Sequence, residues 1–191
     1  DLKLGTAPPV DLLLLEQELR SFLHELLHGD FMQRRVPEGA RRINDIALSG
    51  NGEPTSAAEF ALVIQLVAKL KRELQLQLPS DIKLVLITNG SLMHRDYVQQ
   101  GLRLMAEQNG EVWFKLDRAS ESGMLRTNDT RISMNKVRDN LRTSISLCPT
   151  WLQTCWFAVD GEPPSKQDEN DYLEFVSSLL HEGNQLEGVL L

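Results

Sequence analysis

Residues 43–55 read Ile-Asn-Asp-Ile-Ala-Leu-Ser-Gly-Asn-Gly-Glu-Pro-Thr. The apolar run Ile43–Leu48 is typical of a strand, and the turn residues that follow it end the strand. Ser56 to Glu59 has the spacing of a capping box, and apolar residues at helical spacing run from Phe60 to Leu74. The stretch therefore predicts a strand, a tight turn and a helix whose apolar stripe faces a core.

The same unit recurs along the chain. We expect further strands at Lys83–Thr88, Val112–Asp117, Trp151–Val159 and Leu186–Leu191, and further helices at residues 9–28, 94–108, 132–141 and 168–180. This alternation predicts an α/β fold with a parallel sheet. The pattern opens with a helix, as in a barrel or doubly wound sheet without its first strand. We therefore expect Ile43–Leu48 at one edge of the sheet and Leu186–Leu191 at or near the other.

Composition limits the class of protein. The chain has 191 residues, of which 41% are hydrophobic, so one domain spanning residues 1–191 is expected. A net charge of −7 argues against a nucleic-acid backbone or an anionic membrane as the main partner, although it allows a local basic patch. No apolar run reaches the roughly 18 residues of a membrane span. Two cysteines make no disulfide framework, so a cytoplasmic location is the default.

The turn from Gly50 to Glu53 is the first candidate site. In parallel α/β folds, ligands bind at the carboxyl ends of the strands, and this turn follows a predicted strand directly. Its two glycines let the backbone approach a ligand closely, and the Glu53 carboxylate can accept a hydrogen bond from an ammonium group. On composition alone, however, an ordinary strand-to-helix turn with an incidental glutamate is the favoured interpretation.

A resemblance to a known family makes the first interpretation specific. Ala47–Thr55 resembles the "GGE" motif of the radical S-adenosylmethionine (SAM) superfamily, in the "SGxGEPT" form of one branch. Val85–Gly90 resembles the family's third strand with its "TNG" ending, and Val112–Asp117 resembles its fourth. Trp151–Thr154 would fall on the fifth strand and Leu186–Leu191 on the sixth. The resemblance implies an incomplete parallel (β/α) barrel of about five strands, TIM-like and open at the side of the missing first strand.

The resemblance also implies a function. The parent enzyme would bind SAM and a [4Fe–4S] cluster and generate a 5′-deoxyadenosyl radical, with an electron donor and an unidentified substrate as partners. In this family the glycine turn binds the amino group of SAM, which would assign that group to Gly50, Asn51, Gly52 and Glu53. Further polar residues expected to line the strand ends are Thr88, Asn89, Lys115, Asp117 and Gln153.

The chain departs from the family in its cysteines. The CxxxCxxC loop that holds the cluster is absent, and Cys148 and Cys155 are too widely spaced to replace it. We expect both cysteines to be small apolar core residues, and we expect no residue of this chain to bind metal. The simplest interpretation is a piece of a longer enzyme, cut at both ends. The alternative is a naturally cluster-free barrel that acts as a binding or interaction domain.

His24-Glu25-Leu26-Leu27-His28 matches the HExxH pattern of zinc hydrolases. On a helix, the two histidines would share one face and could hold one Zn²⁺. Here they continue a polar stripe opposite the leucine-rich face, so we expect them to be exposed rather than catalytic. The polar segment from Asp117 to Ser122 is likewise expected to be a solvated loop.

Overall fold

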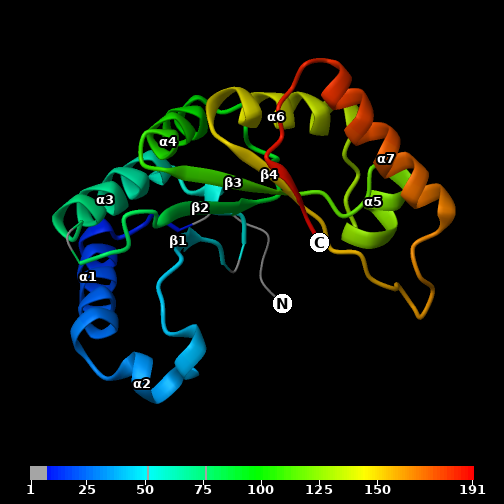
Figure 1. Cartoon of the computed structure of the whole chain (residues 1–191). Helices are drawn as coiled ribbons and strands as arrows, with labels where there is room; N and C mark the ends of the chain where they lie inside the picture. The colour runs from blue at the N-terminus through cyan, green and yellow to red at the C-terminus, as the bar shows by residue number, and fades with distance from the viewer. Residues whose placement is uncertain (1–7, 51, 76) are drawn as a thin grey trace.

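The computed structural model describes residues 8–50, 52–75 and 77–191 (Figure 1). The strands in this part of the chain are β1 (Asp45–Leu48), β2 (Lys83–Thr88), β3 (Gly110–Lys115), β4 (Thr150–Gln153) and β5 (Gly188–Leu190). The helices are α1 (Leu12–His28), α2 (Phe31–Arg35), α3 (Phe60–Glu73), α4 (Asp96–Ala106), α5 (Glu121–Asn128), α6 (Met134–Leu147) and α7 (Lys166–His181). Two 3₁₀ turns, η1 (Glu38–Ala40) and η2 (Pro54–Ser56), flank β1.

The strands form one open, parallel sheet in the order β1-β2-β3-β4-β5. This confirms the α/β class and the expected edges, with β1 at one end of the sheet and β5 at the other. Parallel strands need crossover connections, and each connection is right-handed with very few exceptions. Because the chain moves across the sheet in one direction only, right-handed crossovers place successive helices on the same face.

The packing agrees with this winding. Leu86 of β2 and Val112 of β3 are register partners, and both belong to the main hydrophobic core. The same core contains buried side chains of α3, α4, α6 and α7, among them Ile64, Leu102 and Leu141. Figure 1 shows these four helices arched over one side of the sheet. The opposite face is therefore left for a ligand cavity.

Helix α1 packs mainly outside this core, although its Leu19 is packed against it. It begins at Leu12, three residues later than predicted, because Asp11 caps it by accepting hydrogen bonds from the backbone N–H groups of Leu13 and Leu14. Its buried residue is Leu23, which joins a small second cluster. Phe22 is 48% exposed and lies edge-on against Phe31 of α2. No helix in the described part of the chain has the length and apolar character needed to cross a membrane.

Several local expectations were wrong. Ser56 and Glu59 form no capping box, because the Ser56 hydroxyl donates to the Glu53 carbonyl and the Glu59 side chain makes no cap. A capping box is present instead at the start of α7, between Ser165 and Asp168. Helix α6 runs on to Leu147, well beyond the predicted end.

The segment after β3 is the larger correction. Asp117, Arg118 and Ala119 were expected in a solvated loop, but they are buried, and Glu121 opens helix α5. Strand β4 is also shorter than predicted, ending at Gln153. These two segments meet at the carboxyl ends of the strands, which is where the candidate site lies.

Candidate ligand-binding site at the strand ends

A cavity of about 1030 Å³ lies across the carboxyl ends of the strands and the sheet face opposite the helices. Eight of the nine residues expected to bind SAM line it: Gly50, Gly52, Glu53, Thr88, Asn89, Lys115, Asp117 and Gln153. The ninth, Asn51, lies outside the described residues. The cavity also takes in side chains that the sequence argument did not select, namely Ser49, Ile87, Trp113, Thr154, Cys155, Trp156, Leu190 and Leu191.

The glycine turn presents open backbone to this cavity. The Gly52 N–H donates to the Gly50 carbonyl at 2.8 Å, which folds the turn tightly. Gly52 has a φ of +141°, a conformation that side chains other than glycine's rarely adopt. A Cβ added at either glycine would meet no atom within 4 Å. The backbone conformation therefore favours glycine at position 52, whereas packing within the chain requires glycine at neither position.

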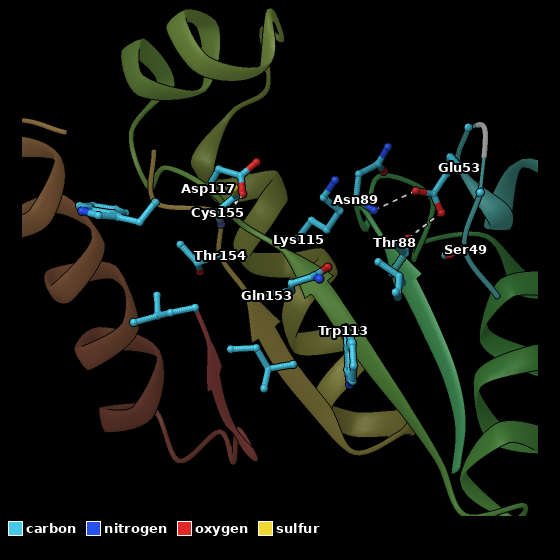
Figure 2. Close-up of a pocket in the computed structure, with 16 residues that line it drawn as sticks. Ser49, Glu53, Thr88, Asn89, Trp113, Lys115, Asp117, Gln153, Thr154 and Cys155 are labelled. Atoms are coloured by element: carbon cyan, nitrogen blue, oxygen red, sulfur yellow. Dashed lines mark hydrogen bonds between the residues drawn. The ribbon is translucent and has the colours of Figure 1, made fainter. Parts of the chain in front are cut away.

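Glu53 is held more firmly than expected. Its Oε1 accepts hydrogen bonds from the Thr55 N–H at 3.1 Å and from the hydroxyls of Thr55 and Thr88, each at 2.6 Å. Its Oε2 accepts from the Asn89 N–H at 2.8 Å (Figure 2). A carboxylate offers about four acceptor positions, so only Oε2 retains room for a ligand donor. Glu53 thus joins the end of β1 to the end of β2, in addition to any contact with a ligand.

Lys115 and Gln153 occupy the middle of the cavity. They are register partners on β3 and β4 and project into the same space (Figure 2). Lys115 is exposed and makes no ion pair within the described residues. The Gln153 Oε1 atom is buried and has no hydrogen-bond partner in the same part of the chain. Both side chains therefore keep polar capacity that the protein itself does not use.

Asp117 has the opposite character. It is only 6% exposed, and both carboxylate oxygens are engaged. Its Oδ1 accepts from the Cys155 N–H at 2.8 Å and its Oδ2 accepts from the Asn128 side-chain amide at 2.9 Å. These bonds join the end of β3 to the segment after β4 and to α5. Asp117 lines the cavity, but its carboxylate serves mainly to hold the rim together.

The two cysteines lie in different surroundings. Cys148 is buried as expected; burial, helped by the Glu111 charge, raises the pKa of its thiol to about 12. Cys155 was expected in the core, but it is exposed and lines the cavity. The shortened strand explains the difference, because Asp117 captures the backbone of Cys155 just after β4 ends.

These cysteines do not fit an iron–sulfur cluster. Cys148 precedes β4 and Cys155 follows it, so the length of the strand, on the order of 20 Å, separates them. Across residues 8–50, 52–75 and 77–191, no group of three His, Cys, Asp or Glu side chains is placed to hold a metal ion. His24 and His28 are exposed as predicted, with ring centroids 4.9 Å apart, and His28 is hydrogen-bonded to Gln77.

The sequence contained a signal for one of the missed residues. Side chains two apart on a strand share a face, so Trp113 must enter the same space as Lys115. Trp156 and Leu190 gave no such signal, because their place depends on how the segments around β4 and β5 fold. Comparisons with family models, with curated proteins and with solved structures gave no match.

Proposed function

We propose that this chain is part of a radical SAM barrel and that the cavity at its strand ends binds SAM. One observation carries the proposal. Residues selected from three separate motifs, after β1, β2 and β3, line a single cavity together with Gln153 of β4. Any parallel sheet brings its strand ends together, so the support comes from which residues lie there: the glycine turn with Glu53, Thr88 with Asn89, and Lys115 with Asp117 are the residues that the three motifs single out.

The sheet supports the barrel part of the proposal. Its strands follow one another in sequence order, and the helices over the main core lie on one face. A doubly wound sheet reverses its strand order and carries helices on both faces. The sequential strand order and the single helical layer are what consecutive (β/α) units of a barrel would have, which supports the proposal.

Different residues of the chain would bind different polar groups of the ligands. The open backbone of Gly50 and Gly52, with Oε2 of Glu53, suits the amino group of SAM. Lys115 and Gln153 supply an unpaired cation and an unpartnered amide for the other polar groups of the ligands. With its cluster, SAM supplies the radical chemistry of this family; the protein binds, orients and encloses it.

The cluster itself is not accounted for by this sequence. Its two cysteines lie at opposite ends of β4, so the cluster ligands, the electron donor and the substrate all belong to the proposal rather than to the observed site. The free thiols fit a reducing, cytoplasmic location, which is part of the same proposal.

The test is SAM binding by isothermal titration calorimetry. Gly52→Ala adds a methyl group at φ +141° beside the cavity, and Gly183→Ala adds one at φ +85°, after α7. Neither methyl group would meet an atom within 4 Å, so Gly183→Ala serves as the control for a methyl group at a positive φ outside the cavity. We expect Gly52→Ala to weaken SAM binding by about tenfold, which corresponds to about 1.4 kcal/mol of binding free energy. We expect Gly183→Ala to leave SAM binding unchanged. Equal binding of SAM by both variants, or no binding of SAM by the unsubstituted chain, would refute the proposal.

A cluster-free binding domain is the second candidate. The separation of Cys148 from Cys155 favours it, since no cluster can form between them. This candidate predicts that the chain binds a small molecule in the same cavity but shows no preference for SAM over adenosine. The same calorimetric titration, run with both compounds, distinguishes the two functions.

A further inference from the structure

The floor of the cavity differs from its upper part. Trp113 of β3 is the register partner of Ile87 on β2, and these two apolar side chains line the cavity side by side. The next row towards the carboxyl ends contains Lys115 and Gln153 and is polar. A ligand that fills the cavity therefore meets an apolar surface at the bottom and polar groups above it.

The Trp113 ring is fixed in place from below. Its indole N–H donates to the Glu111 carboxylate at 2.9 Å, and the same carboxylate pairs with the Lys83 ammonium at 3.3 Å. The Glu111 side chain is 12% exposed, so this contact is largely shielded from water. Hydrogen bonds to a charged group are stronger than neutral ones and more demanding in geometry. The contacts from the Lys83 ammonium through the Glu111 carboxylate to the Trp113 indole thus set the orientation of an aromatic ring that lines the cavity.

A fixed aromatic face favours a planar partner. An aliphatic group would pack equally well on leucine or isoleucine, which need no hydrogen bond to orient them. Aromatic rings gain from offset or edge-on stacking beyond the area that they bury, and the gain depends on ring orientation. Orientation is what Glu111 provides.

Lys115 adds a preference for a ligand that carries an anionic group. It lies two residues beyond Trp113 on the same face of β3, at a Cα separation of about 7 Å. It has no ion pair in the described part of the chain, and it points into the cavity (Figure 2). An anionic group attached to a ring on Trp113 would therefore be within its reach.

We propose that the middle of this cavity is a second subsite, for an aromatic ring that carries an anionic group, with Trp113 as the stacking surface and Lys115 as the cation. The inference rests on the proposed function only in naming this ligand as the substrate beside SAM. SAM would occupy the turn between Gly50 and Glu53, at the ends of β1 and β2. Lys115 is thereby assigned to the substrate and not to SAM.

The test uses naphthoate as the probe, its fully hydrogenated counterpart as the non-planar control, and naphthamide as the uncharged control. Binding to the intact chain is followed by calorimetry and by the NMR signals of the indole N–H groups of the three tryptophans. We expect naphthoate to bind about fivefold more tightly than its hydrogenated counterpart, as stacking predicts. We expect it to shift the Trp113 indole signal and to bind together with SAM rather than in competition with it.

Substitutions locate the effect. Trp113→Leu should reduce the preference for the planar probe to within about twofold, whereas Trp113→Phe, which keeps a ring but loses the N–H that Glu111 holds, should retain part of it. Phe157→Leu removes an exposed ring outside the cavity and should leave the preference intact. Lys115→Met should weaken naphthoate binding without weakening naphthamide binding.

Three results would overturn the inference: no binding of naphthoate, a planar preference that survives in folded Trp113→Leu, or competition between naphthoate and SAM. If Trp113→Leu does not fold, the indole signals of the unsubstituted chain and the binding of Trp113→Phe decide. The two proposals fail separately. A chain that binds naphthoate as described but not SAM loses the proposed function and keeps the aromatic subsite.

Discussion

The Thr88 hydroxyl donates a hydrogen bond of 2.6 Å to the Glu53 carboxylate, so the last residue of β2 is tied to the turn after β1. The same hydroxyl accepts from the Gly90 N–H at 3.0 Å. The Glu53 carboxylate is thus the centre of a small network that shapes the "TNG" segment and the glycine turn together. Glu53, which the motif predicts as a ligand contact, therefore also positions the turn.

The first prediction concerns this network. Glu53→Ala leaves the buried hydroxyls of Thr55 and Thr88 without their acceptor, and should lower the free energy of unfolding by about 2 kcal/mol. Glu59→Ala removes a nearby glutamate with one long contact, to the Val10 N–H, and should change it by less than about 0.5 kcal/mol. Urea denaturation measures both. Equal stability of the two variants would show that the network does not support the fold.

A second prediction concerns Asp117, whose carboxylate joins three segments. Asp117→Ala leaves the Cys155 N–H without its acceptor and should destabilise the fold by about 2–3 kcal/mol. Asp117→Asn keeps one oxygen for that N–H, and the Asn128 amide can turn to present its own oxygen. We therefore expect Asp117→Asn to lower the free energy of unfolding by less than half as much as Asp117→Ala does. The urea midpoints of the two variants check this order, and its reversal would count against the assigned role.

The third prediction is a pH dependence. Burial acts to raise the pKa of Asp168, but hydrogen bonds from Ser165 and the charge of Arg126 outweigh it, and the pKa lies below its ordinary value. A lowered pKa means that the folded state stabilises the ionised Asp168 carboxylate more than the unfolded state does. The resulting stability is present above the ordinary pKa of about 4 and is lost as the pH falls through the folded-state value.

Asp168→Asn should therefore be less stable than the unsubstituted chain at neutral pH, and the difference should shrink below about pH 4. Glu169→Gln, an exposed change in the same turn of α7, should leave the pH dependence unaltered. Thermal unfolding at several pH values measures the slope. A difference between Asp168→Asn and the unsubstituted chain that is constant from neutral to acid pH would contradict the prediction.

The fourth prediction concerns thiol reactivity. The pKa of the Cys148 thiol is raised to about 12, so it stays protonated at pH 8 as well as buried. Cys155 is exposed at the cavity. One thiol of the native chain should react rapidly with a disulfide reagent, and the second only after denaturation. Cys155→Ser should abolish the fast phase and Cys148→Ser should not; two equally fast thiols would disagree with the structure.

Much of the fold was predictable from the sequence. The apolar run Lys83–Thr88 became β2 with the predicted bounds, because a strand with a nearly continuous apolar run fits a buried parallel sheet. The edge positions of β1 and β5 followed from the order of the elements. Half of the residues that line the cavity were also predictable, since in parallel folds the ligand-binding residues follow the strands. The sequence motifs alone predict eight of these residues.

The tertiary structure decided what each of those residues does. Sequence spacing placed Glu53 and Asp117 in the site, but only the fold brought Thr88, Asn89, Cys155 and Asn128 to their oxygens. Trp113 acquired its fixed ring from Glu111 and, through it, from Lys83 on the neighbouring strand. Strand and helix patterns are local, so a sequence can state them. Which donor meets which acceptor depends on segments that are distant along the chain, and that is settled only when the sheet assembles.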